Sequence, residues 1–214
     1  PDLGPELASL CGIPVRGRSL RLRLHYRTSE ETRAFAARVL GEEPFDDLDG
    51  GREDRRGDRS LLRGPLPEVR EYGSFEEEIR GIRDVLETLL SEGTREVTCL
   101  VVRKRELLRR ITEALEALGV PLRPLDSEIP DDPALPGLRV GTLHRVKGLE
   151  FDHMIVAGAC EGVLPSPSVL GSSEDPRVRA LLERRERSLL HVALTRARRT
   201  VLVTSPGPRS RFLG

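Results

Sequence analysis

The chain has 214 residues, of which 37% are hydrophobic and 33% are charged, and this size and composition support one domain with a single core. Its 35 basic and 35 acidic residues cancel, so no global field draws the protein to nucleic acid or to a membrane surface. No apolar stretch approaches the roughly 18 to 20 residues of a membrane span, and three cysteines without metal-type spacing or a signal peptide indicate the reducing cytoplasm.

The first forty residues are expected to hold a connecting segment, a strand and a helix. Residues 1–19 are rich in Gly and Pro, and because they begin without Met we expect the chain to be a fragment of something longer. Leucines alternate with arginines over residues 20–24, which predicts a strand buried on one face. The strand leads to His-Tyr-Arg-Thr at 25–28, and Ser29 is then the expected N-cap of a helix that ends near Leu40.

The middle of the chain alternates between helix and strand signals. Residues 41–67 are rich in Gly, Asp and Arg and predict an exposed loop or short hairpin, since their spacing does not fit a calcium-binding loop. A helix capped by serine is predicted over 74–91. The apolar run at 97–102 is typical of a parallel strand covered on both faces. A further helix is predicted over 105–118, closed by Gly119.

A polar turn between two apolar strands is the strongest site candidate. Residues 121–136 contain five prolines, so we expect no regular element there. A strand is predicted over 138–141, then a polar turn of helix, then a second strand over 154–157. Ligands bind at the carboxyl ends of strands in open parallel sheets, so the turn between these strands is expected to carry a site.

The last third is expected to complete the sheet. A surface loop, a helix and a final strand are predicted over 159–176, 177–197 and 200–204. Charges of both signs at 183–187 favour a solvated helix face over a nucleic-acid patch. The alternation of strands and helices along the chain predicts an α/β fold with a doubly wound parallel sheet and helices on both faces.

Short motifs in this frame resemble those of a known family. Residues 142–151 read Thr-x-His-x-x-Lys-Gly-Leu-Glu-Phe, and residues 191–197 read His-Val-Ala-Leu-Thr-Arg-Ala, with Glu-Gly-Val-Leu-Pro at 161–165 between them. In this order and spacing they resemble motifs V and VI of the UvrD/Rep-type superfamily 1A DNA helicases. The strand followed by Tyr-Arg-Thr resembles motif IV, although His25 stands where that motif has Asn, and His191 stands where motif VI has Tyr.

The resemblance covers nearly the whole chain and implies its domain organisation. Residues 20–214 would be the second RecA-like core domain, after a connecting segment at 1–19. Its sheet would be of the RecA-like, P-loop-NTPase type but without the P-loop, because the sequence has no G-x-x-x-x-G-K-[ST] motif. The family's large inserted subdomain is expected to be absent, since only about a dozen residues separate Leu125 from Leu138.

The same resemblance implies an ATP site shared with another domain. Arg27 and Arg196 would be arginine fingers, which give hydrogen bonds to the γ-phosphate of ATP as negative charge develops. Glu150 would accept hydrogen bonds from the ribose hydroxyls, and Gly148 would lie beside it in the ATP site. No metal ligand is predicted in this chain, because the Mg²⁺ ligands of the family belong to its N-terminal RecA-like domain. The alternative for each arginine is a surface residue at a helix end.

Three motif V residues are implied to face DNA. Thr142, His144 and Lys147 resemble the residues that contact single-stranded DNA and link it to the nucleotide. The alternative for His144 is an ordinary structural histidine.

Together these patterns predict the C-terminal motor domain of an ATP-dependent DNA helicase or translocase with 3′ to 5′ polarity. Its predicted partners are ATP with Mg²⁺, single-stranded DNA and an N-terminal RecA-like domain of the same protein, with no membrane. We expect the isolated chain to be inactive. Two alternatives stay open: a RecA-like module that binds DNA or protein without hydrolysis, and an unrelated flavodoxin- or receiver-like domain.

Overall fold

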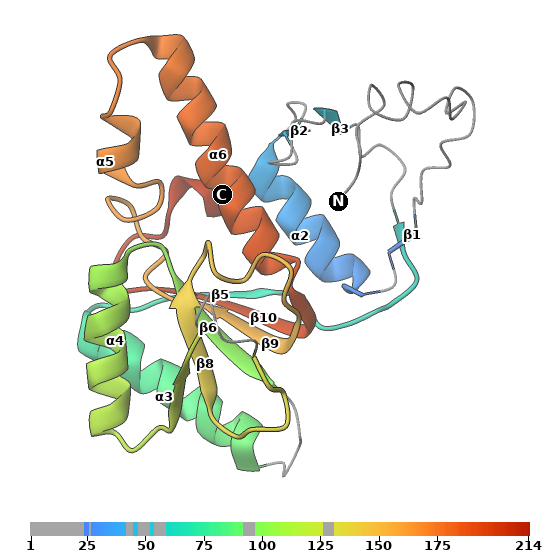
Figure 1. Cartoon of the computed structure of the whole chain (residues 1–214), viewed down its shortest axis with the longest axis vertical. Coiled ribbons are helices and arrows are strands. Elements are labelled where there is room, and N and C mark those ends of the chain that lie inside the picture. The colour runs from blue at the N-terminus through green and yellow to red at the C-terminus, as the bar shows by residue number, and fades with distance from the viewer. Residues whose placement is uncertain are drawn as a thin grey trace, which may run out of the picture.

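The computed structural model describes residues 24–25, 27–41, 45–46, 52–53, 59–91, 97–125 and 131–214. Within them, six parallel strands form one sheet in the order β5-β10-β9-β6-β8-β7 (Figure 1). These strands are β5 (Glu68–Glu71), β6 (Thr98–Val102), β7 (Leu122–Pro124), β8 (Leu138–Thr142), β9 (Phe151–Val156) and β10 (Ala197–Ser205). The predicted parallel α/β sheet is confirmed.

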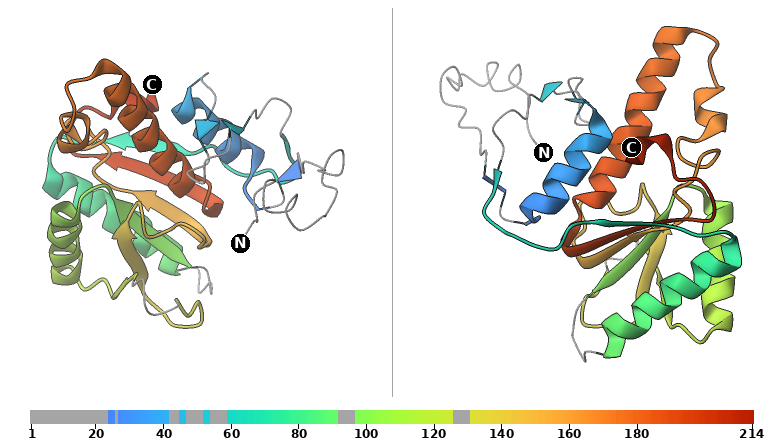
Figure 2. Two further views of the ribbon diagram at one scale, coloured as in Figure 1. Left: turned by 45° about the horizontal axis from the view of Figure 1, so that its top comes forward. Right: turned by 180° about the vertical axis from the view of Figure 1, so that it is seen from behind.

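Helices cover both faces of this sheet, as Figure 2 shows from two further sides. One face packs against α2 and α6, and the other packs against α3 and α4. The helices are α2 (Glu30–Leu40), α3 (Phe75–Ser91), α4 (Arg105–Ala117), the short α5 (Pro167–Leu170) and α6 (Pro176–Leu194), followed by the 3-10 turn η1 (Arg211–Leu213).

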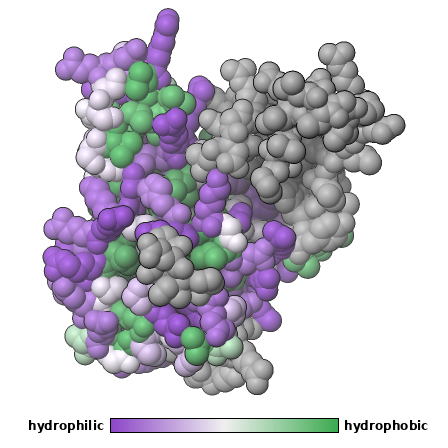
Figure 3. Space-filling view, viewed as in Figure 1, coloured by the Kyte–Doolittle hydropathy of each residue, from purple (hydrophilic) through white to green (hydrophobic). Residues whose placement is uncertain are grey.

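Hydrophilic side chains dominate the described surface in Figure 3, interrupted by smaller hydrophobic patches. Exposed leucines at 61, 62 and 66 and the apolar residues Val178 and Leu181 at the start of α6 contribute such surface. Among the helices of the described residues, none combines the length and apolar character that crossing a membrane requires.

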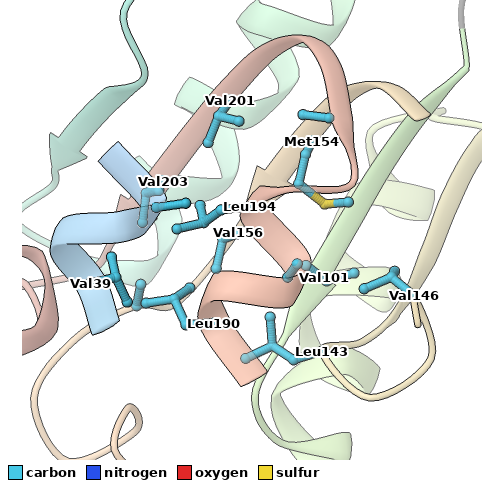
Figure 4. Close-up of a cluster of buried hydrophobic side chains, with 14 of the residues drawn as sticks. Val39, Val101, Leu143, Val146, Met154, Val156, Leu190, Leu194, Val201 and Val203 are labelled. Carbon is cyan, nitrogen blue, oxygen red and sulfur yellow. The ribbon is translucent and has the colours of Figure 1, made fainter. Parts of the chain in front are cut away.

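The core follows from the two-residue period of the strands. In β6, Cys99 and Val101 face the α2/α6 side, whereas Leu100 and Val102 face the α3/α4 side. All four are fully buried, as the predicted apolar run requires. Figure 4 shows the α2/α6 side, where Leu190 and Leu194 lie against side chains of the sheet.

The helix starts form where the sequence predicts them. The Ser29 hydroxyl accepts a hydrogen bond from the Thr32 N–H at 3.2 Å, which caps α2. At α3, the Ser74 hydroxyl accepts from the Glu77 N–H at 3.2 Å, and the Glu77 carboxylate accepts from the Gly73 N–H at 2.8 Å. These reciprocal bonds satisfy donors that the first helical turn would leave unpaired.

The segment before α3 contains short paired strands. Strands β2 (Phe45–Asp46) and β3 (Arg52–Glu53) pair antiparallel, which agrees with the short hairpin predicted within 41–67. Strands β1 (Leu24–His25) and β4 (Arg59–Ser60) pair parallel. The rest of the strand predicted at 20–24 and the connecting segment expected at 1–19 lie outside the described residues.

Two predictions about the later elements are wrong. The proline-rich segment does contain a regular element, because β7 pairs with β8 at the edge of the sheet. An edge strand needs hydrogen bonds on one side only, so it tolerates Pro124. The last helix ends at Leu194, three residues before the predicted end, and β10 begins at Ala197.

Candidate functional site

The link from β8 to β9 crosses a face of the sheet. Both strands pair with β6 from opposite sides and run in the same direction, so residues 143–150 must return from the carboxyl edge to the amino edge. Leu143 and Val146 of the link are buried in the α2/α6 core. Hydrogen bonds from the Arg145 N–H to the Thr142 carbonyl at 2.8 Å and from the Leu149 N–H to the Val146 carbonyl at 3.1 Å hold it as successive turns.

This crossing corrects the predicted site at a single edge. Thr142 and His144 lie at the carboxyl edge, where β8 ends, whereas Glu150 lies at the amino edge, immediately before β9. The predicted turn of helix is also absent from the link, because residues 143–148 form turns and residues 149–150 form no regular structure. Lys147 and Gly148 lie on exposed parts of the link between the two edges, and Gly148 has φ +83°.

Arginines surround Glu150 at the amino edge. Its Oε1 lies 3.0 Å from Arg27 Nη1, and its Oε2 accepts hydrogen bonds from Arg198 Nη2 at 2.6 Å and Nε at 3.1 Å. Arg196 also lies next to Glu150, because its carbonyl accepts a hydrogen bond at 3.0 Å from the N–H of Phe151, the residue that follows Glu150. The structure therefore brings together the three charged residues assigned to ATP by motifs IV, V and VI, namely Arg27, Glu150 and Arg196, and adds Arg198.

The protonation of this cluster follows from its contacts. The hydrogen bonds from Arg198 lower the pKa of Glu150, and the positive charges of Arg27, Arg198 and Arg196 lower it further. Burial lowers the pKa of Arg196, and the charge of Arg27 adds to this effect while Glu150 opposes it. Glu150 is therefore ionised at neutral pH, with a surplus of positive charge around it.

Hydrogen bonds between motifs IV and VI fix the arginines on the fold. The Thr28 hydroxyl donates to the Thr195 carbonyl at 3.0 Å, which ties the residue after Arg27 to the residue before Arg196. Arg196 Nε donates to the Val192 carbonyl at 3.2 Å, so its guanidinium folds back along the end of α6. The side chain of Arg27 is 76% exposed, which leaves it free to move.

His191 joins α6 to α2 where the family motif has Tyr. Its ring is buried, and Nδ1 lies 3.0 Å from the Ala36 carbonyl. One turn earlier, Arg187 Nη1 donates to the Val39 carbonyl at 2.9 Å and its guanidinium stacks on Phe212. His191 therefore makes a polar contact between α6, which carries motif VI, and α2, which follows motif IV.

A polar groove of about 570 Å³ lies at the carboxyl edge. Its lining is mainly basic and hydroxyl-bearing and consists of Arg103, Lys104, Arg105, Thr142, His144, Arg145, Ser166, Ser168 and Val169. Burial lowers the pKa of His144, and the charge of Arg103 lowers it further. His144 is therefore mostly neutral at pH 7, so the arginines and the lysine supply the positive charge of the groove.

Glu186 organises one wall of this groove. Its side chain is 4% exposed and accepts from Arg103 at 2.6 and 2.7 Å. It also accepts from the Ser166 N–H at 3.0 Å. One buried carboxylate from α6 thus holds the residue that follows β6 and the loop that precedes α5.

The motifs identify only part of the two sites. Arg198 and Arg103 were not predicted. The solvated helix face predicted at 183–187 is wrong for Glu186, which is buried. The basic run at 103–105, directly after a buried strand, is a sequence signal that marks the groove. Lys147 is absent from the groove lining. Within the described ranges, no group of three or more His, Cys, Asp or Glu residues is arranged to hold a metal ion.

Comparison with known proteins identifies related sequences. Residues 131–206 match the family model of the UvrD-like helicase C-terminal domain. YjcD of Bacillus subtilis (strain 168) is 38% identical over 84 residues, which cover 36% of this chain and 11% of that protein. The ATP-dependent DNA helicase UvrD2 of Mycobacterium tuberculosis (strain ATCC 25618 / H37Rv) is 35% identical over 120 residues, which cover 50% of this chain and 16% of that protein.

A solved structure has the same fold. It is the C-terminal domain of a possible DNA helicase from Lactobacillus plantarum WCFS1, with a TM-score of 0.61 and 23% identity over 88% of this chain and 92% of that chain. The family match contains Thr142, Glu150 and Arg196, so both edges of the site contribute residues to it. Residues 131–206 are therefore similar to the UvrD-like helicase C-terminal domain, and the chain as a whole shares the fold of the solved domain.

Proposed function

We propose that this chain is the second motor domain of an ATP-dependent DNA helicase or translocase that moves 3′ to 5′ along single-stranded DNA. In this proposal it supplies half of an ATP site, and an N-terminal RecA-like domain supplies the P-loop and the ligands of Mg²⁺. The observation that carries the proposal is the convergence of Arg27, Glu150 and Arg196 from three separate segments at one edge of the sheet.

The charges of this cluster suit the polyphosphate of ATP. A guanidinium gives hydrogen bonds to phosphate oxygens and stabilises the charge that develops as the γ-phosphoryl group is transferred. Arg27 and Arg196 are the two groups proposed for this role. The ionised carboxylate of Glu150 suits the ribose hydroxyls, which donate hydrogen bonds to it. Gly148 lies two residues before Glu150 on an exposed part of the link, with no atom within 4 Å of where a Cβ would be.

The groove at the carboxyl edge suits the backbone of single-stranded DNA. Lys104, Arg105 and Arg145 provide positive charge for phosphates, whereas the charge of Arg103 is compensated by Glu186. The hydroxyl groups in the lining provide further hydrogen bonds. Thr142 and His144 lie in this lining, as their proposed role in DNA contact requires. Since the molecule has no net charge, this groove is a local basic surface.

The crossing link offers a route for coupling. Residues 143–150 connect the proposed DNA groove to Glu150 in one short passage, and the buried side chains of Leu143 and Val146 anchor that passage in the core. A shift of the link on DNA binding would therefore reposition the carboxylate proposed to contact ribose. We propose that this is how DNA binding alters ATP turnover.

The test separates the roles of Arg196 and Glu150 in the full-length enzyme. Arg196→Ala is expected to lower kcat for ATP on the order of 10³-fold and leave KM nearly unchanged, because a finger acts mainly on transition-state charge. Glu150→Ala is expected to raise KM instead. Steady-state ATPase kinetics with saturating single-stranded DNA measure both values. Arg199→Ala, which removes an exposed arginine three residues from Arg196, is the matched control. An unchanged kcat in Arg196→Ala would overturn the assignment.

A further inference from the structure

The carboxylate of Glu150 is shared unequally by two arginines. Arg198 donates twice to Oε2, through Nη2 at 2.6 Å and Nε at 3.1 Å. Arg27 makes a single contact with Oε1, at 3.0 Å. A carboxylate has about four positions at which it accepts hydrogen bonds. Three of these are occupied by arginine, so little capacity remains for a ligand.

If Glu150 contacts ribose, as the proposed function states, the shortage of acceptor positions on its carboxylate limits how ATP can bind. Recognition of both ribose hydroxyls requires two acceptor positions on Glu150, so one arginine contact must be given up when ATP binds. Arg27 is the group that can leave, because it makes one contact and its side chain is 76% exposed. Arg198 makes two contacts and its side chain is 56% exposed.

We propose that Arg198 is a positioning residue that holds Glu150 in place while Arg27 exchanges Glu150 for the triphosphate of ATP. Before nucleotide binds, Glu150 keeps Arg27 at the amino edge. When the ribose hydroxyls take the position vacated by Arg27, the arginine becomes available to the phosphates. Arg198 stays on Oε2 throughout, so the carboxylate keeps its orientation and part of its charge compensation.

Removal of Arg198 therefore affects ribose recognition specifically. Without it, two acceptor positions on Oε2 are freed, but the carboxylate loses the contact that orients it and can turn with Arg27, the remaining direct partner of Glu150 among the arginines of this cluster. The phosphate contacts of Arg196 are not affected, because Arg196 is anchored separately by the Val192 carbonyl. A nucleotide that lacks the ribose hydroxyls makes no hydrogen bond to Glu150, so its affinity does not depend on Arg198.

The experiment compares ATP with 2′,3′-dideoxy-ATP in the full-length enzyme. Arg198→Ala is expected to raise KM for ATP about tenfold, the effect of losing roughly one charge-assisted hydrogen-bonding arrangement, and to leave KM for dideoxy-ATP within about twofold. The matched control is Arg199→Ala, which removes the neighbouring arginine on the same strand. Arg199 is 61% exposed and lies 3.8 Å from Asp152 rather than beside Glu150. Its removal is expected to change neither KM.

Two further variants separate failure of this inference from failure of the proposed function. Glu150→Ala is expected to abolish the preference for ATP over dideoxy-ATP. If it does so while Arg198→Ala keeps the preference, Arg198 does not position Glu150 and the proposed function stands. If Glu150→Ala also keeps the preference, the ribose contact itself is wrong. Arg198→Gln, of similar length but neutral, replaces Arg198→Ala if thermal unfolding shows that the alanine variant is not folded.

Discussion

Glu78 is a buried acid that connects α3 to the ends of two central strands. Its Oε1 accepts from the Gly158 N–H at 2.8 Å and from the Thr204 hydroxyl at 2.5 Å. Its Oε2 is also buried and makes no hydrogen bond to the described residues. Burial raises the pKa of Glu78, while the bonds from Thr204 and Gly158 oppose this rise. A proton on Oε2 removes the cost of a buried charge.

The raised pKa sets the sign of a pH-dependent stability. Because the folded state holds this proton more tightly than the unfolded state, Glu78 destabilises the fold progressively as pH rises from about 4.5 through the folded-state pKa. Glu78→Gln keeps an acceptor for Gly158 and cannot ionise. We expect its free energy of unfolding, relative to the parent, to increase with pH over this range. Urea unfolding at several pH values measures the difference.

Two outcomes decide whether burial of the charge is responsible. Glu78→Ala removes the acceptor of Gly158 and Thr204 and is expected to cost about 1–3 kcal/mol at low pH, where the parent is protonated. Parallel stability curves for the parent and Glu78→Gln would show that Glu78 titrates equally in both states, contrary to the expectation.

Residues in motifs were predictable, and their charged neighbours were not. The motif order identified Arg27, Glu150 and Arg196, and the structure places them together. Arg198 could not be assigned, because its contact with Glu150 depends on how β10 lies beside β9. That register shifts between Ala197 and Thr200, and a local sequence pattern does not specify such an irregularity.

Among the elements, the link between β8 and β9 shows most clearly what local sequence patterns could not predict, namely the path of the chain between two strands. Leu143 and Val146 are three residues apart, a spacing that fits one turn of helix as well as it fits the observed link. The path of the link depends on β6, which lies between β8 and β9 although it precedes both in sequence. This strand order comes from long-range pairing, so the sequence predicted the strands β6, β8 and β9 individually but placed the polar residues at one edge.

A glycine in this link offers a test of coupling between the edges. Gly148 has φ +83° and no atom within 4 Å of a built Cβ, so Gly148→Ala introduces backbone strain without a collision. Gly119, after α4, has φ +80° and equally open surroundings, which makes Gly119→Ala a matched control. Each change is expected to lower the free energy of unfolding by about 1 kcal/mol.

The two glycine variants should differ in function. In the full-length enzyme, Gly148→Ala is expected to reduce the stimulation of ATPase activity by single-stranded DNA several-fold, because the link joins the proposed DNA groove to Glu150. Gly119→Ala is expected to retain full stimulation. ATPase rates with and without DNA measure this ratio, and equal stimulation in both variants would show that the link does not carry the coupling.

At the scale of the whole molecule, one fold presents candidate functional sites at two edges of its sheet. The alternation of strands and helices was sufficient to predict a parallel α/β sheet, and the buried run of β6 confirms its covered position. The neutral total charge excluded a global attraction to DNA, and the basic groove accordingly lies at one edge. The sequence did not predict how the charges are distributed in space, because the groove residues come from separate segments: the turn after β6, the start of α4, the end of β8, the link, and residues 166–169.

The region between α4 and β8 bears on how the proposed motor treats duplex DNA. Buried Arg139 of β8 ties the described residues 131–137 to the sheet: it contacts Asp131 at 3.2 Å and donates to the carbonyls of Asp132 at 2.6 Å and Gly137 at 3.0 Å. Those residues form turns rather than helix. We propose that this short connection stands in place of the large inserted subdomain that the resemblance to UvrD/Rep-type helicases implies, and to which that resemblance would assign contact with duplex DNA or inhibition of the monomer.

A motor built in this way should move on single strands more readily than it separates duplexes. We expect monomers of the full-length protein to translocate along single-stranded DNA, because the groove and the ATP site do not depend on the insertion, and to fail to unwind long duplexes without further domains or partners. Single-turnover assays with excess DNA measure both activities in one preparation, and translocation is the control for an active motor. Long duplexes separated by unaided monomers would contradict this proposal, because the duplex-binding surface assigned to the insertion would then not be needed.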